Sequence, residues 1–148
     1  QAWAILNFSA IAVNASDPDL PAYNPGLAEY ATNIATRTAD WFLDNLPDDF
    51  VPYWDFSVSG DAPRDSSAAA IAASGLLTLS QLTGDDTYVE ATENILGSLV
   101  DNYLAGDGEA SLLTGGSGNV PAGVAVDTGV IFGDYYFLAA IDAYEELQ

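Results

Sequence analysis

Apolar residues recur at helical spacing in several stretches of the chain, and this pattern predicts helices joined by turns and loops. The expected helices cover residues 1–13, 25–46, 65–81, 86–104 and 127–148. Between them lie a proline-rich loop, a long loop rich in aromatic residues and a glycine-rich loop, because prolines and glycines interrupt regular structure. We expect Asn24-Pro25 and Asp65 or Ser66 to begin helices, as N-cap and first-turn residues.

The stretches differ in how many of their faces are apolar. The first, third and last are apolar on nearly all sides, as in largely buried helices. The second and fourth are amphipathic, and in the second the apolar face is expected to hold Leu27, Tyr30, Ile34, Trp41 and Leu46. This alternation predicts an all-α fold without a sheet, an incomplete α/α barrel of inner and outer helices. A helical repeat or bundle is the alternative, disfavoured because no strict repeat period is present.

The charge of the chain excludes several kinds of partner. Among its 148 residues, 22 are acidic and two, Arg37 and Arg64, are basic, so the formal net charge is −20. Nucleic-acid binding needs basic side chains against phosphates, and an anionic membrane would repel this surface. No stretch approaches the roughly 20 apolar residues of a membrane-spanning helix. The length predicts a single domain over residues 1–148.

The missing residue types narrow the chemistry further. Cysteine, histidine and methionine are absent, which removes disulfides, thiol nucleophiles, Ser-His-Asp triads and the usual zinc sites. A general acid or base must be a carboxyl group or a tyrosine. Carbohydrate enzymes work within that limit, since paired carboxyl groups can cleave glycosidic bonds.

The loop Val51-Pro52-Tyr53-Trp54-Asp55-Phe56 is the first candidate site. Sugar rings stack their C–H faces on aromatic side chains, and carboxylates accept hydrogen bonds from sugar hydroxyls. A buried loop anchor explains the same composition equally well. Downstream, Arg64 precedes a helix N-terminus, where an anion such as a uronate carboxylate would be favoured. Alternatively, Arg64 pairs with Asp55 or Asp65 and fixes the loop, which we favour from the residues alone.

Two further features carry weaker signals. Asp127 and Asp134 are seven residues apart in the last expected helix, hence on one face, and could form a carboxylate pair. We favour instead that Asp127 caps the helix and that Asp134 binds a neighbouring loop, with Gly133 allowing close packing. Asn7 and Asn14 match the N-glycosylation pattern, and Asn14, at a helix end, is the accessible candidate.

Three segments in order resemble unsaturated glucuronyl hydrolases, glycoside hydrolase family 88. Gln1-Ala2-Trp3-Ala4-Ile5 resembles the start of an inner helix in that family. The stretch 51–56 followed by 63–73 resembles its Pro-Tyr-Trp-Asp-Phe and Pro-Arg-Asp-Ser motifs, and the stretch 118–137 resembles its closing segment. The order and spacing agree from Gln1 to the C-terminus, so the resemblance is to the C-terminal portion of the family.

The resemblance implies an (α/α)6 barrel that hydrates the C4=C5 double bond of unsaturated uronyl oligosaccharides without a metal or organic cofactor. An aspartate protonates the alkene, water adds at C5, and the hemiketal opens with loss of the glycosidic bond. The key aspartates are expected upstream of Gln1, so no catalytic residue is expected in this chain. The substrate-binding candidates are Trp3, Tyr53, Trp54, Asp55, Arg64, Asp65, Ser66 and Asp127.

The chain also departs from the family pattern. Gly115 stands where the family often has histidine, Val120 where it often has a basic residue, and Asp127-Thr128-Gly129 replaces a more usual Asp-Val-Ser. These changes bear on the substrate subtype. The other class of function left open is a non-catalytic carbohydrate-binding or self-assembling helical module.

Further expectations concern partners and location. The chain alone is expected to be inactive and to need the N-terminal half of the barrel or another copy of itself. The acidic composition and the sequons predict an extracellular protein of a polysaccharide-degrading organism, such as a fungus, although a haloarchaeal protein adapted to high salt would carry the same charge.

Overall fold

The computed structural model describes residues 1–147, which fold into α-helices and one short 3-10 helix. The elements are α1 (Ala2–Ser16), α2 (Pro25–Asp44), α3 (Ser66–Thr83), α4 (Thr87–Asn102), η1 (Val120–Ala122) and α5 (Ile131–Glu145). Within these residues the loops form isolated antiparallel bridges and no strand. The expected all-α fold without a sheet is therefore confirmed.

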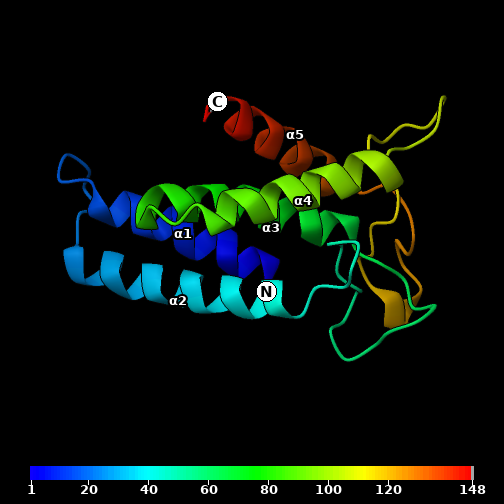
Figure 1. Ribbon diagram of the computed structural model, residues 1–148, viewed down its shortest axis with the longest axis horizontal. Coiled ribbons are helices and arrows are strands. Elements are labelled where there is room, and N and C mark those ends of the chain that lie inside the picture. Colours follow the sequence, from blue (N-terminus) through cyan, green and yellow to red (C-terminus); the bar gives the residue numbers. More distant parts are fainter. Residues whose placement is uncertain (148) are drawn as a thin grey trace.

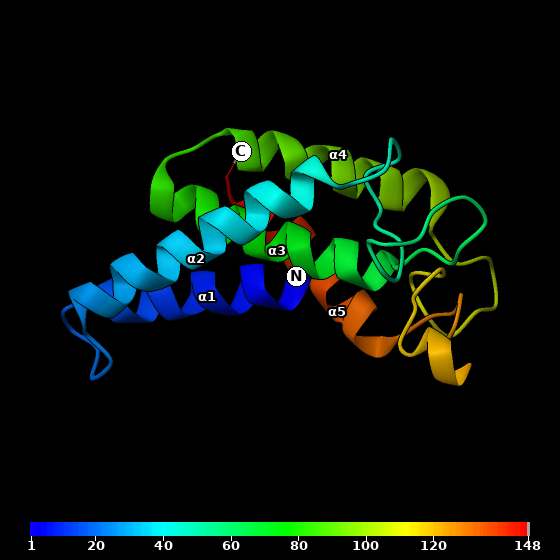
Figure 2. The same cartoon turned by 90° about the horizontal axis from the view of Figure 1, so that it is seen from below.

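The helices lie in two rows. α1, α3 and α5 lie side by side as an inner row, and α2 and α4 cover them as an outer row (Figure 2). α3 lies at the centre and contacts the other four helices. The long loops gather at one end, on the right in Figure 1, and the short turns lie at the opposite end. This arrangement is the arc of an α/α barrel that the alternation of helix types predicts.

α3 is the most completely surrounded helix. Asp65 caps its N-terminus, where its side chain accepts hydrogen bonds from the backbone nitrogens of Ser67 and Ala68, and Gly84 caps its C-terminus in the left-handed conformation. Its small residues allow neighbours to approach closely: a Cβ on Gly75 would lie 2.7 Å from the backbone nitrogen of Leu6 on α1. Buried side chains occur on every face of α3, as its apolar sequence predicts.

The buried face of α2 differs from the expected one. The helix packs through small residues and one aromatic ring, namely Ala28, Ala31, Ala35, Ala39 and Phe42. Leu27, Tyr30 and Trp41 are exposed instead. Alanines let α2 lie close against α1, so the larger side chains turn outward. α2 is an amphipathic outer helix as predicted, but the predicted face was wrong.

The two helices that end the inner row are more exposed than their apolar sequences predict. On α1, Trp3, Ile11 and Val13 are 46%, 40% and 43% exposed. On α5, Ile131 and Tyr135 are 82% and 64% exposed. Each of these helices has an inner neighbour on one side only, as expected for a barrel that does not close, so their apolar sequences are less buried than such a pattern alone suggests. None of the helices in the described part of the chain is long and apolar enough to cross a membrane.

α5 begins later than the sequence predicts. Gly116 and Thr128 exchange backbone hydrogen bonds of 2.8 and 3.1 Å, which hold residue 128 in an extended bridge. Asp127 precedes this bridge with a φ of +51°, and the helix starts at Ile131 without a side-chain cap. Asp127 therefore does not cap α5, and it does not share a helical face with Asp134.

Candidate functional site

Most of the predicted binding residues line one cavity of about 350 Å³ at the loop end of the arc. α1 contributes Trp3, the aromatic loop contributes Tyr53, Trp54 and Asp55, and the start of α3 contributes Asp65. Phe56 of the candidate loop also lines the cavity, together with residues that carry no site signal in the sequence, among them Gln1, Ser117 and Phe132. The cavity therefore joins segments that lie far apart in the sequence.

Aromatic packing holds the rings around this cavity. Trp3 meets Tyr136 of α5 edge to face at 5.3 Å between ring centroids and lies 6.3 Å from Phe132. Phe56 is wedged between Trp41 and Phe42 of α2, at 4.9 and 5.5 Å. Because neighbouring rings hold them, Trp3 and Phe56 present fixed apolar surfaces, which suit the C–H faces of a sugar.

Asp65 has one carboxylate oxygen committed to structure and one available. Its Oδ1 accepts hydrogen bonds from the backbone nitrogens of Ser67, Ala68 and Ser117, at 3.2, 3.3 and 3.2 Å, and from the Ser67 hydroxyl. No side chain or backbone group of residues 1–147 donates to Oδ2. The cap fixes the orientation of the carboxylate, so its second oxygen can accept a hydrogen bond from a bound hydroxyl.

Asp55 lies at the exposed edge of the same cavity. Its Oδ1 accepts hydrogen bonds from the Ser57 hydroxyl and from the Ser57 backbone nitrogen, the latter at 2.7 Å. These two bonds, the hydroxyl first, hold the pKa of Asp55 below its usual range. The carboxylate therefore remains a negatively charged acceptor down to acidic pH.

Arg64 lies outside the cavity lining and fixes the loop. Its Nη1 pairs with the Asp49 carboxylate at 3.0 Å and donates to the Val51 carbonyl at 2.7 Å. Its guanidinium lies over the Tyr53 ring, 4.0 Å from the centroid. The loop-fixing hypothesis is confirmed, but the partner is Asp49 and not Asp55 or Asp65. The sequence gives no signal for this pairing, because it depends on how the loop folds.

Asp49 also fastens the end of α4. Tyr103 donates its hydroxyl to the second Asp49 oxygen at 3.0 Å. Burial, together with this hydrogen bond to a negative partner, raises the pKa of Tyr103 to about 12. The aromatic loop is thus tied to both α3 and α4.

Two serines join the glycine-rich loop to the start of α3. Ser66 is buried, its hydroxyl donates to the Thr114 carbonyl at 2.6 Å, and its backbone nitrogen donates to Gly115. Ser66 therefore points into the loop contact and not into the cavity, contrary to the binding prediction. Ser117, which does line the cavity, donates its hydroxyl to the Arg64 carbonyl at 2.7 Å.

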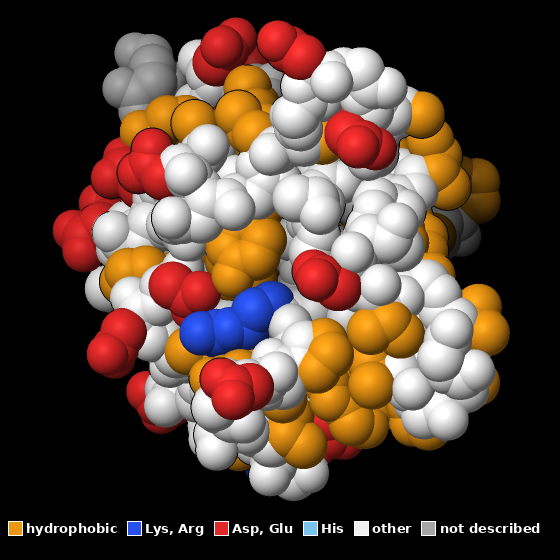
Figure 3. Space-filling model, turned by 90° about the vertical axis from the view of Figure 1, so that its right-hand side faces the viewer, with side chains coloured by type: hydrophobic (Ala, Val, Ile, Leu, Met, Phe, Trp, Pro, Cys, Tyr) orange, Lys and Arg blue, Asp and Glu red, His pale blue; other side chains and the backbone are white. Residues whose placement is uncertain are grey.

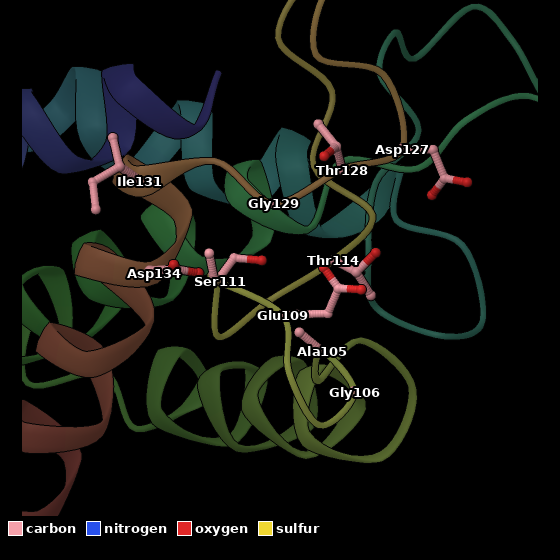
Figure 4. Close-up of a pocket in the computed structure, with 11 residues that line it drawn as sticks. Ala105, Gly106, Glu109, Ser111, Thr114, Asp127, Thr128, Gly129, Ile131 and Asp134 are labelled. Carbon is pink, nitrogen blue, oxygen red and sulfur yellow. The ribbon is translucent and has the colours of Figure 1, made fainter.

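Asp127 lies in a second cavity of about 570 Å³, shown in Figure 4. Glu109, Ser111 and Asp134 also line it. Asp127 and Asp134 lie at opposite sides of the close-up, so they do not form a pair. Asp134 accepts a 2.9 Å hydrogen bond from the Leu113 backbone, which confirms that it binds a neighbouring loop. Nowhere between residues 1 and 147 do three or more acidic side chains group in a way that could hold a metal ion.

The packing of Gly133 agrees with its predicted role. A Cβ there would lie 3.1 Å from the Cβ of Ser67 on α3. The first turn of α5 therefore rests directly on the first turn of α3. This contact brings Phe132 to the edge of the cavity lined by Trp3.

Comparisons with known proteins support the resemblance. The chain is 34% identical to an unsaturated glucuronyl hydrolase of Formosa agariphila over 99% of its length, and 37% identical to one of Bacillus sp. strain GL1 over 95%. It spans only 36% and 37% of those relatives. No family model matches the chain.

A solved structure gives the same result in three dimensions. A variant of the unsaturated glucuronyl hydrolase from Streptococcus agalactiae, complexed with dGlcA-GalNAc6S, superposes with a TM-score of 0.83 at 29% identity. The superposition covers 99% of this chain and 39% of that one. The chain therefore corresponds to the C-terminal portion of the unsaturated glucuronyl hydrolases, glycoside hydrolase family 88.

Proposed function

We propose that this chain forms the aromatic wall of a sugar-binding site in a hydrolase of unsaturated uronyl oligosaccharides. The observation that carries the proposal is the cavity in which Trp3 and Trp54 lie beside the carboxylates of Asp55 and Asp65. A relative of the same fold has been solved with dGlcA-GalNAc6S, which supports a ligand of this class. The rings would stack on the sugar, and the free oxygen of Asp65 would accept a hydroxyl hydrogen.

We further propose that the catalytic aspartate belongs to a part of the barrel outside this sequence. The relatives are nearly three times as long as the segment they share with this chain. In the proposed reaction, that aspartate protonates C4 of the uronyl alkene and water adds at C5. The hemiketal then opens and releases the neighbouring sugar. The wall described above would orient the ring without taking part in proton transfer.

The exposed ends of the inner row support the need for a partner. Ile131, Tyr135 and Leu138 on α5 form an apolar strip, and Trp3 and Ile11 extend the apolar surface of α1. Exposed apolar surfaces of this kind favour association. The occupant we propose is the remaining part of the barrel; another copy of the chain is the alternative.

Titration calorimetry of the 148-residue chain with an unsaturated uronyl disaccharide tests the proposed wall. We expect binding that weakens at least about tenfold in Trp54→Ala, whereas Tyr30→Ala, which removes an exposed ring of α2, leaves the affinity unchanged. No binding at all would contradict the proposed wall and favour a self-assembling structural module. Binding with no turnover even in a complete barrel would favour a non-catalytic carbohydrate-binding module.

Loss of alkene absorbance with the same ligand tests the proposed location of the acid. We expect no turnover by the isolated chain, because general acid help is worth about 10²–10⁴-fold in such steps. Clear turnover that is abolished by Asp65→Asn or Asp127→Asn would show that the acid lies in this chain.

We also propose that the protein is secreted. Asn14 is exposed near the end of α1, where its side chain donates to the Ala10 carbonyl at 2.8 Å. Mass spectrometry of the natural protein should find a hexose-bearing glycan on Asn14. Stability only in molar salt would instead favour a high-salt habitat.

A further inference from the structure

The free flank of α5 is an apolar strip. Its members, Ile131, Tyr135 and Leu138, recur every three or four residues and therefore lie on one face of the helix. Asp142 continues the same face toward the C-terminal end of α5. Gly133 rests against α3 on the opposite face, so the strip is turned away from the inner row and is free to bind a partner.

The free flank of α1 has the same helical spacing and carries no charge. Asn7, Ile11 and Asn14 line a groove of this flank together with Leu27 of α2. Although the chain has a formal net charge of −20, α1 contains no charged residue. Acidic side chains are spread over the loop end shown in Figure 3. A partner surface that carries carboxylates, such as the flank of α5, can therefore approach α1 without meeting a carboxylate on that helix.

We infer that two copies of this chain pair head to tail into a ring, in which the α5 flank of each copy covers the α1 flank of the other. The first turns of α1, α3 and α5 line one cavity, so these helices run in the same direction away from the loop end (Figure 1). A two-fold axis along them keeps all the inner helices parallel and makes the two contacts equivalent, so the ring closes. The inference goes beyond the proposed function, in which the remaining part of the barrel covers the same flanks.

The size of the ring sets the number of copies. The chain superposes on the Streptococcus agalactiae relative with a TM-score of 0.83, so its arc has the curvature of that helical barrel. It covers 39% of that relative. A ring of this size therefore has room for a second copy and no room for a third.

The contact between Trp3 and α5 sets the register of the pairing. Within one copy, the Trp3 ring lies 6.3 Å from Phe132 and 5.3 Å from Tyr136, so Trp3 is level with the turn between them. A two-fold rotation about an axis along the helices does not change these levels. Asn7, four residues beyond Trp3, is therefore level with residues 136–140 of the other copy, and Leu138 is their midpoint.

The same register brings complementary polar groups together further along the helices. Asn14 comes level with Glu145 of the other copy and lies within one turn of Asp142. The amide of Asn14 can donate hydrogen bonds, and a carboxylate accepts them. The paired flanks would thus bury the apolar strip of α5 near the loop end and satisfy its carboxylates near the turn end.

Sedimentation equilibrium of the 148-residue chain provides the first test. We expect a dimer that tightens between 0.1 M and 1 M NaCl, because the screening length falls from about 10 Å to about 3 Å and weakens the repulsion between two acidic chains. Leu138→Asp should raise the dissociation constant at least about tenfold. Leu104→Asp, at a leucine of similar exposure outside both flanks (49% against 53%), adds the same charge and should leave the dissociation constant nearly unchanged.

Single cysteines identify which flanks meet. The chain contains no cysteine, so each variant has one reactive thiol. A mixture of Asn7→Cys and Leu138→Cys should form a crosslinked dimer with a short bismaleimide, whereas neither variant should crosslink alone. Crosslinking of either variant by itself would show that like flanks meet, and would overturn the head-to-tail pairing.

The oligomeric state can also overturn the inference without affecting the proposed function. A monomer at every concentration and salt, or oligomers larger than a dimer, would exclude the two-copy ring and leave the proposed sugar-binding wall intact. Failure to bind the disaccharide would contradict the wall and leave the ring intact.

Discussion

The helical rows and the loop end of this molecule are stabilised by different interactions. Around α3, alanines and leucines are fully buried, and no salt bridge is needed to hold α1, α3 and α5 together. At the loop end, Asp49, Arg64 and Tyr103 form a polar network, and backbone bridges join the loops. Apolar burial in the helical rows is spread over many residues, so no single side chain dominates their stability. The loop end depends on a few directional contacts.

The helices and the polar network contribute differently to the stability of the chain and to the shape of the cavity. The cavity lies at the loop end, yet its floor is formed by the first turns of α1, α3 and α5. Rigid helices set the positions of Trp3 and Asp65, while the Arg64 guanidinium of the polar network lies over the ring of Tyr53. A change in the network should therefore alter the cavity without unfolding the helices, and a change between the helices should unfold the whole chain.

The largest expected effect comes from adding one methyl group between the inner helices. In Gly75→Ala, the new Cβ would lie 2.7 Å from the backbone nitrogen and 2.8 Å from the Cα of Leu6, neither of which can move alone. We expect the free energy of unfolding to fall by about 3 kcal/mol, as for overpacked cores. Urea denaturation measures it.

Gly97→Ala on α4 is the matched control. Beyond the backbone of α4 itself, no atom of the described residues lies within 4 Å of a Cβ at that position. Alanine has a higher helix propensity than glycine, so the free energy of unfolding of this variant should rise by up to about 1 kcal/mol. Equal effects of the two substitutions would contradict the close contact between α1 and α3.

Removal of the carboxylate that joins the loops should have a smaller and more local effect. Asp49→Ala breaks the contacts with Arg64 and Tyr103. We expect the free energy of unfolding to fall by about 1–2 kcal/mol. Fully buried hydrogen bonds to charged groups contribute somewhat more than this, and the side chains of Asp49 and Arg64 are only partly buried. Amide hydrogen exchange should accelerate in residues 49–65 and stay slow in α3. Asp48→Ala, at an exposed neighbour without a hydrogen-bond or ion-pair partner among residues 1–147, should change neither quantity.

Relief of a left-handed backbone position should stabilise the loop end slightly. Ala125 has a φ of +50°, a region that disfavours every residue with a Cβ. We expect Ala125→Gly to raise the free energy of unfolding by about 0.5 kcal/mol. This net value allows for the greater conformational entropy of glycine in the unfolded chain, which opposes the gain. The same substitution at exposed Ala10, within α1, should lose about 1 kcal/mol. Thermal denaturation measures both changes. Melting temperatures that shift in the same direction for the two variants would contradict the contrast between the two regions.

The smallest expected effect is a pH dependence confined to the network. The pKa of Tyr103 is raised to about 12 in the folded protein, above its unfolded value. Its contribution to stability is therefore complete below about pH 10 and is lost as the pH rises through about 12. The difference in unfolding free energy between the natural chain and Tyr103→Phe should be constant from pH 7 to 9 and shrink at pH 11. A difference that grows with pH would have the wrong sign.

The sequence predicts the helical region better than the loop end. Periodicity locates each α-helix between residues 1 and 147, although not the short 3-10 helix η1, and Asn24 and Asp65 cap their helices as expected. The buried face of α2 was misjudged because alanine is a weak hydrophobic signal but an effective residue for close packing. Trp3, Tyr53, Trp54, Asp55 and Asp65, which the resemblance indicates as binding candidates, line one cavity, and their role in binding stays a prediction. The partner of Arg64 and the position of Asp127 depend on loop geometry, which periodicity does not encode.

The small residues of α3 also determine how this helix can vary. At Ala69, Ala70, Ala72 and Ala73, all fully buried, glycine is the only smaller replacement, and almost every random codon change introduces bulk. A saturation library selected for folded protein should therefore lose most α3 variants, whereas the exposed face of α2, with Tyr30, should accept many. The centre of the arc would stand out in such a library as the segment with the least tolerance of substitution.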